Sequence, residues 1–193
     1  MAYLHPTYMN VLPLSSLDPP PDRGADGLLV AVRAGLPDAL ASVYRAHASA
    51  MLMLAYRLTV SRADAEDVVH DVFVALPEAL TRYEERGQFR AWLMRVTARM
   101  ALMRQRRAGN ESHAMPDEVT APPTAERDPV AAQRIHRALR QLSPSLRHVF
   151  VLRVLYDHPH ADIAAMLGIT VNASEVRLHR AVQQLRILLE DLA

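Results

Sequence analysis

The feature that most constrains the fold is the spacing of apolar residues, which follows the period of an α-helix over most of the chain. Between residues 63 and 80, Val69, Val72, Phe73 and Leu76 stand at positions i, i+3, i+4 and i+7 and form one apolar stripe. No convincing strand and no internal repeat is found. Aromatic residues make up only 5%, and Ala and Leu dominate the apolar set, a composition that favours packed helices. We therefore predict an all-α protein.

Four helices are predicted before residue 108. The first lies between an N-cap at Asp26 and a terminating Gly35, and the second begins at Pro37. The third covers 63–80 and is bent or interrupted near Pro77. The fourth follows a loop over residues 81–89. The expected inward residues are Leu40, Val43, Tyr44, Met51, Leu54 and Leu58 in the second helix, and Leu93, Val96, Met100 and Met103 in the fourth.

Two proline-rich stretches divide the chain. Residues 1–25 contain five prolines and no helical period, which predicts a flexible or partner-ordered tail. Residues 108–128 contain three prolines, and five acids face one arginine there, which predicts a flexible acidic linker. The expected organisation is therefore two small helical domains, at 26–107 and 129–193.

Proline marks the helix starts of the second domain. Asp128-Pro129 and Ser143-Pro144 each pair an N-cap residue with a proline in the first turn. A short helix around 161–167, a turn at Gly168 and a last helix over 171–189 follow. The expected inward residues are Ile135, Ala138, Leu139, Leu142, Val149, Phe150, Leu152, Leu155, Val171, Leu178, Val182, Leu185 and Leu189.

The strongest local motif lies between Asp162 and Arg180. A short helix, a glycine turn and a second helix with outward arginines is the pattern of a helix-turn-helix, whose second helix enters the major groove. In such a motif Arg177 and Arg180 contact phosphates or guanine. An ordinary corner between two helices, without DNA binding, remains an alternative.

Charge in the first domain is segregated. Asp64, Asp67 and Asp71 share one helix face. Their wide spacing and the lack of His argue against a metal site, and a solvated face is the simplest interpretation. Seven arginines and no acid lie between Arg86 and Arg107. Arginines interleaved with Phe89 and the single Trp92 suit single-stranded nucleic acid, because the cations hold the backbone while rings stack on bases. Alternatively, Trp92 belongs to the core.

Several function classes have no support. Cys is absent, which excludes disulfides and fits a reducing, cytoplasmic location. No apolar run reaches the ~20 residues that a membrane span needs, and the N-terminus does not resemble a secretory signal. The nine His residues show no metal-ligand spacing, and no catalytic or cofactor-binding motif stands out. We expect no enzyme activity, no cofactor, no metal and no membrane insertion.

The segments Asp64–Phe73 and Gly87–Arg95 resemble region 2 of the extracytoplasmic-function (ECF, group IV) sigma factors, which belong to the sigma-70 family. Leu142–Arg147 and Arg177–Ala181 resemble region 4 of the same proteins. The resemblance covers residues 26–190, and the two blocks occur in the family's order. It implies a specificity subunit that binds core RNA polymerase and directs promoter recognition, DNA melting and transcription initiation.

The resemblance also implies residue roles. The polymerase β′ subunit would be bound by Asp64, Glu66, Asp67, Asp71 and Phe73. The non-template strand of the minus-ten element would be held by Arg86, Gln88, Phe89, Trp92, Arg95 and Arg99. The minus-thirty-five duplex would be read by Asn172, Ala173, Val176, Arg177 and Arg180. The linker would thread basic channels of the polymerase, whose β and β′ subunits are both expected partners. An anti-sigma factor is a further candidate partner, because members of the group are commonly held inactive by one.

The sequence departs from the family at several of these positions. Arg99 stands where Asn is frequent, and Met103 where Asp is frequent. The last helix begins Asn172-Ala-Ser-Glu175 in place of Gly-Thr-Val-Lys. Ser174 therefore puts a hydroxyl where an inward Val is usual, and Glu175 puts an acid where a base often meets phosphate. Promoter sequence is not transferable from the family.

Two other functions compete with the sigma factor. A stand-alone helix-turn-helix regulator would bind operator DNA unaided, but it leaves the acidic helix and the single-strand surface without a role. A regulatory module of this fold that binds only protein, for instance through the tail, is supported by Ser174 and Glu175.

Overall fold

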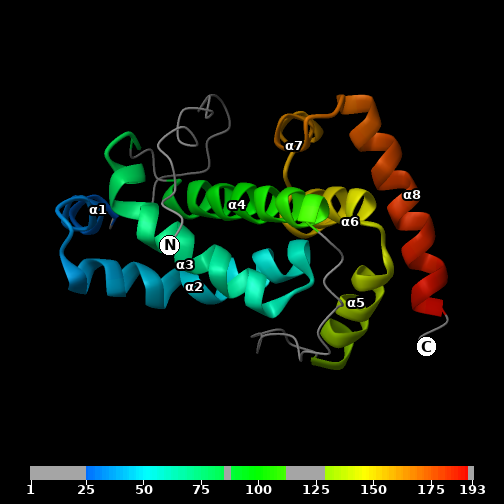
Figure 1. The fold of residues 1–193 in the computed structure, drawn as a ribbon, viewed down its shortest axis with the longest axis horizontal. Helices are drawn as coiled ribbons and strands as arrows, with labels where there is room; N and C mark the ends of the chain where they lie inside the picture. Colours follow the sequence, from blue (N-terminus) through cyan, green and yellow to red (C-terminus); the bar gives the residue numbers. More distant parts are fainter. Residues whose placement is uncertain (1–24, 85–87, 112–128, 191–193) are drawn as a thin grey trace.

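The computed structural model describes residues 25–84, 88–111 and 129–190, and within these ranges the secondary structure is helical with no strand. The prediction of an all-α protein is confirmed. Figure 1 shows two groups of helices side by side, α1–α4 and α5–α8. Residues 1–24 of the predicted tail and most of the predicted linker (112–128) lie outside the described residues, so the domain boundaries stay a prediction.

Local sequence signals set the limits of the first two helices. α1 spans Ala25–Arg33, so Asp26 lies inside the helix and not at its N-cap. Gly35 follows with φ +72°, a left-handed conformation that only glycine adopts readily. α2 spans Pro37–Thr59 and begins at its proline, as predicted. Its inward stripe is confirmed except for Tyr44, which is 51% exposed.

α3 spans Arg62–Leu80 and is capped by Ser61, whose hydroxyl accepts a hydrogen bond from the Asp64 backbone N–H at 3.2 Å. The predicted stripe of Val69, Val72, Phe73 and Leu76 is buried. Of the two effects expected of Pro77, the interruption is wrong, because the helix continues to Leu80, and the bend stays a prediction. Burial of Leu76 and Leu80 holds the last turn in place despite the missing backbone donor.

α4 spans Phe89–Glu111 and extends four residues into the predicted linker. Its predicted stripe is confirmed in part: Leu93 is fully buried, Val96 and Met100 are half-buried and pack against the core, and Met103 is half-buried. Thr97, Ala98, Ala101 and Leu102 are also buried. The two alanines leave room for α4 to pack closely against α2 and α3, both of which it contacts.

The second group comprises α5 (Pro129–Gln141), α6 (Pro144–Phe150), η2 (Val151–Leu155), α7 (His160–Leu167) and α8 (Val171–Glu190). The two proline starts are confirmed. The sequence did not predict that α6 widens into η2, a π-helical turn.

Three inward assignments in the second group are wrong. Ile135 is 37% exposed and its neighbour His136 is buried in its place, while Val171 and Val182 are exposed. The buried face of α8 consists of Ser174, Ala181 and Leu185, with Leu178 half-buried on it. Small residues on this face let α8 contact α6 and α7.

The two groups pack together where the C-terminal end of α2 meets α5 and α6. The ring of Tyr56 lies edge-on to His136, with centroids 5.6 Å apart. Arg57 donates to Nε2 of His136 at 3.4 Å and to the hydroxyl of Tyr156 at 3.5 Å. His148 hydrogen-bonds to the backbone of Leu58. These contacts form what we call the α2 seam.

A separate contact joins α4 to α7. Arg106 donates to the backbone carbonyl of Met166 at 2.6 Å. A second link involves His158, which lies just before α7. Burial is the largest cause that lowers the pKa of His158, and the charge of Arg95 on α4 lowers it further. The nearby carboxylates of Asp162 and Asp157 act in the opposite direction. The helix-turn-helix therefore contacts α4, the arginine-rich helix of the first group.

The buried imidazole of His148 makes the seam sensitive to acid. Burial is the largest cause that lowers the pKa of His148, which falls to about 3. The positive charges of Arg147 on α6, Arg106 on α4 and Arg177 on α8 act in the same direction, and the hydrogen bond to Leu58 acts against them. His148 is therefore neutral in the packed protein at pH 7.

We predict that acid weakens the packed structure through His148. The pKa of His148 is lower in the folded protein than its unfolded value near 6.5. The contribution of neutral His148 to the free energy of unfolding is therefore fully present above pH 6.5 and is lost as the pH falls from there toward 3. Each pH unit in this window costs about 1.4 kcal/mol of the free energy of unfolding. Urea titrations at pH 7.5 and 5.5 measure the loss. His148→Gln, which does not titrate, should lose correspondingly less, and an equal loss in both proteins would contradict the assignment.

Candidate polymerase and nucleic-acid interfaces

The turn between α7 and α8 has the geometry of a helix-turn-helix. Gly168 adopts φ +67°, and its N–H donates to the carbonyl of Ala164, which ends α7. Thr170 then caps α8, because its hydroxyl accepts a hydrogen bond from the Ala173 N–H at 3.1 Å. Ile163 is fully buried beneath the two helices. The start of the second helix is thus fixed from both sides of the turn.

The predicted duplex-reading residues lie on the accessible side of this helix. Asn172, Val176 and Arg180 are exposed, and Ala173 and Arg177 are half-buried. Glu175 is also exposed among them. Surface access is what base and phosphate contacts require; the roles themselves stay a prediction.

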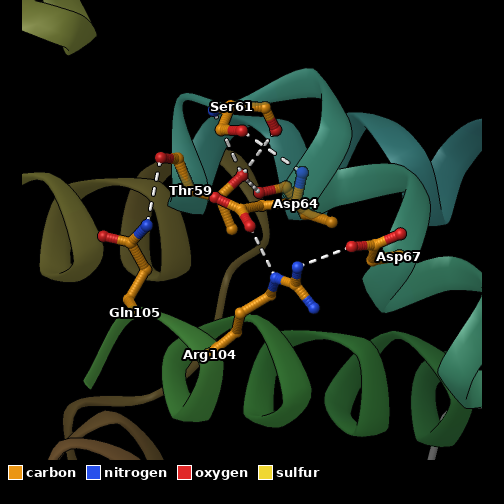
Figure 2. Close-up of polar contacts among 7 residues, drawn as sticks. Thr59, Ser61, Asp64, Asp67, Arg104 and Gln105 are labelled. Atoms are coloured by element: carbon orange, nitrogen blue, oxygen red, sulfur yellow. Dashed lines mark hydrogen bonds and ion pairs between the residues drawn. The ribbon is translucent and has the colours of Figure 1, made fainter. Parts of the chain in front are cut away.

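The acidic face of α3 is paired with a residue that the sequence did not single out. Arg104 on α4 lies 2.6 Å from a carboxylate oxygen of Asp64 and 2.5 Å from one of Asp67, as Figure 2 shows. Burial is the largest single influence and lowers the pKa of Arg104, but the hydrogen bond to Asp64 and the negative charges of Asp64, Asp67 and Asp71 outweigh it and raise its pKa overall. All three acids therefore act on one cation, which confirms that they share a face.

The other predicted polymerase-binding residues differ in accessibility. Glu66 is exposed and pairs with Arg62 one turn earlier at 2.8 Å. Phe73 is buried and lies beneath Tyr44, with ring centroids 4.9 Å apart. The exposed aromatic at this position is therefore Tyr44, which the sequence had placed inward.

The aromatic residues of the predicted strand-binding surface belong to the core. Phe89 is 7% exposed and Trp92 is 4% exposed, and both pack against Tyr83, with centroids 6.0 Å and 4.8 Å from its ring. This agrees with the alternative that Trp92 is a core residue. Base stacking by either ring stays a prediction that requires the ring to leave this cluster.

The polar residues of that surface remain accessible. Arg90 is exposed, and Gln88, Arg95 and Arg99 are half-buried. Arg95 donates to the side-chain oxygen of Gln88 at 3.5 Å, and burial lowers the pKa of Arg99. Arg86, also predicted for this surface, lies outside the described residues.

Within the described ranges, no group of three or more His, Asp or Glu side chains is placed to hold a metal ion. In the same ranges, no single helix is long and apolar enough to cross a membrane. One pair passes that test jointly, residues 27–33 with 37–59, and it is bent by 119°.

The fold is that of a helical protein with a helix-turn-helix formed by α7 and α8. Residues 43–111 match the family described as Sigma-70 region 2, and residues 132–185 match Sigma-70, region 4. The chain belongs to the sigma-70 family, as an ECF RNA polymerase sigma factor. The stand-alone regulator is not favoured.

Individual relatives support this membership. The chain is 31% identical to ECF sigma factor SigE of Mycolicibacterium smegmatis over 74% of its own length and 58% of SigE. It is 31% identical to sigma factor CarQ of Myxococcus xanthus over 83% of its length and 94% of CarQ. It is 32% identical to sigma factor CnrH of Cupriavidus metallidurans, over 86% and 95%. The structure of CnrH with the cytosolic domain of CnrY matches with a TM-score of 0.55 and 26% identity, covering 86% of this chain and 97% of that one.

We predict a small, salt-dependent contribution from the Arg104 pairs. Their side chains are partly exposed, so Arg104→Ala should lower the free energy of unfolding by about 0.5–1 kcal/mol in dilute buffer, and by less in 0.5 M NaCl. Urea titrations at the two salt concentrations measure this. Arg62→Ala, which breaks the i,i+4 pair within α3, is the matched control. A loss above about 2 kcal/mol that salt does not reduce would contradict a surface pair.

Proposed function

We propose that the activities of this sigma factor are divided among three helices. The acidic face of α3 binds the β′ subunit of core RNA polymerase, the arginines of α4 hold the unpaired strand of the minus-ten element, and α8 reads the minus-thirty-five duplex. The observation that carries the proposal is the segregation of charge: acids on α3 and uninterrupted arginines along residues 86–107. As a transcription initiation factor, the chain supplies promoter choice and strand opening while the polymerase supplies the chemistry.

The structure modifies the residue set for this proposal. Tyr44 joins the polymerase-binding surface, because it is exposed and contacts Phe73, one of the residues predicted for that surface. On α4 the proposal rests on Arg90, Arg95 and Arg99, since Phe89 and Trp92 are buried. Arginine forms strong charge-assisted bonds with phosphate oxygens, so these residues suffice to follow a strand backbone.

We also propose a regulatory protein partner. CnrH, a relative that the chain covers almost fully, has been solved with the cytosolic domain of CnrY. A comparable anti-sigma domain would restrict access of this chain to the polymerase.

We predict that Asp67→Arg with Asp71→Arg abolishes co-purification with bacterial core RNA polymerase. Asp67 is exposed and Asp71 is half-buried, so reversal repels a basic partner without opening the core. Asp38→Arg with Glu84→Arg changes the net charge equally at two exposed acids outside α3 and should leave binding intact. If both pairs of changes reduce binding equally, the acidic face is not the binding surface.

Absence of binding by the unchanged chain would favour masking by its own tail or the protein-only module. A variant lacking residues 1–25, tested in parallel, separates these: recovered binding indicates masking by the tail, and no recovery favours the protein-only module.

We predict that Arg90→Ala with Arg95→Ala impairs promoter opening more than polymerase binding. Each lost contact to a single-strand phosphate should reduce the salt dependence of binding by about 0.7 in log–log slope. Permanganate reactivity of unpaired thymines measures opening, and co-purification measures polymerase binding. Arg45→Ala with Arg137→Ala removes two exposed arginines on other helices, α2 and α5, and serves as the control. Equal loss of both activities would count against a strand-binding role.

A further inference from the structure

One polar side chain is buried inside the helix-turn-helix. Ser174, in the first turn of α8, has 0% exposure. Its hydroxyl lies 2.9 Å from Nδ1 of His160, the first residue of α7, and either group can donate depending on the tautomer of the ring. The sequence indicated an inward hydroxyl at this position but gave no partner for it.

The surroundings of this hydrogen bond are apolar. Ile163 and Ala181 are buried, and Leu178 is half-buried on the same face of α8. Apolar contacts hold two helices together but tolerate small rotations, because they have no preferred direction. A hydrogen bond has a narrow range of distance and angle. A buried hydroxyl that lost its partner would be destabilised, so the bond constrains the pair to one geometry.

The bond is placed where this constraint bears on recognition. Ser174 lies between Ala173 and Val176, which belong to the predicted reading surface. The other described constraints at this end of α8, the Gly168 turn and the Thr170 cap, act along the chain. The His160–Ser174 bond instead joins the far end of α7 to α8 across 14 residues. It therefore controls the angle between the helices and not only the start of α8.

We propose that His160 is a positioning residue for DNA recognition, which acts through Ser174 to set the angle at which the first turn of α8 meets the duplex. This inference rests on the proposed function of α8. It assigns the specificity of the minus-thirty-five contact partly to a residue that does not belong to the reading surface.

The test uses the full chain assembled with bacterial core RNA polymerase. The wild-type complex selects from promoter duplexes in which the upstream and downstream blocks are randomised separately, and the affinity of each variant for the selected sequence is measured at 15 °C. His160→Ala and Ser174→Ala should each weaken the upstream interaction by about threefold to tenfold. The double variant should lose no more than either single one, because both remove the same bond. Polymerase binding and the selected downstream block should not change.

Two further variants separate positioning from stability. His160→Asn places an amide near Nδ1 of the ring and should restore the upstream affinity. Ser145→Ala removes an exposed hydroxyl on α6 that contacts Ser143 at 3.2 Å, and should have no effect. Thermal unfolding of each variant is recorded alongside.

The outcomes distinguish the two levels of the argument. Any one of four results would overturn the positioning role and leave the sigma-factor function intact. They are wild-type affinity in both alanine variants, affinity losses that add in the double variant, failure of His160→Asn to restore binding, and affinity losses that follow the melting temperature. If the wild-type complex selects no upstream block, the proposed role of α8 fails and the positioning role fails with it.

Discussion

The packing of α2 is the constraint on which the rest of the structure depends. Met51, Leu54, Ala55 and Leu58 are fully buried at i, i+3, i+4 and i+7, and α2 contacts α1, α3, α4 and α6. Both α3 and α4 pack against α2, and this packing brings Arg104 of α4 against Asp64 and Asp67 of α3. The last turn of α2 also supplies the Tyr56–Leu58 seam that holds the second group of helices.

This packed arrangement is incompatible with simultaneous contact to both promoter elements on the proposed assignment. The two elements are centred about 25 base pairs apart, which is roughly 85 Å of B-form duplex at about 3.4 Å per base pair. Here α7 touches α4 through Arg106 and Met166, so the elements that carry the two proposed DNA-binding surfaces are in contact. The α2 seam must therefore open before both elements are bound. Its hydrogen bonds of 3.4 and 3.5 Å are long and therefore weak.

Most of the fold could be predicted from local sequence, and most of the errors came from tertiary packing. Proline starts, the Gly168 turn and the α3 stripe are local signals and were confirmed. The face of α4 that is buried depends on how the helix packs against α2 and α3. For this reason Ala98 and Ala101 are more deeply buried than the larger Val96 and Met100. Arg104 was missed because its partners lie 37 and 40 residues earlier, a separation at which periodicity carries no information. In the candidate site, the sequence predicted the acidic face of α3 and the arginine-rich α4, but not the ion pairs that Arg104 makes between them.

The helix-turn-helix and the α2 seam differ in whether their buried polar groups have hydrogen-bond partners. In the helix-turn-helix, the buried hydroxyl of Ser174 has its partner in His160, so the junction has one preferred geometry. In and beside the α2 seam, Nε2 of His148 and Nε of Arg147 have no hydrogen-bond partner among the described residues, and burial, as the largest cause, lowers the pKa of Arg147 to about 10. Buried groups left without partners favour exposure to water. The packing of the second group of helices against α2 is therefore weakly stabilised. The helix-turn-helix of α7 and α8, which belongs to that group, is held by a satisfied buried hydrogen bond and is more rigid.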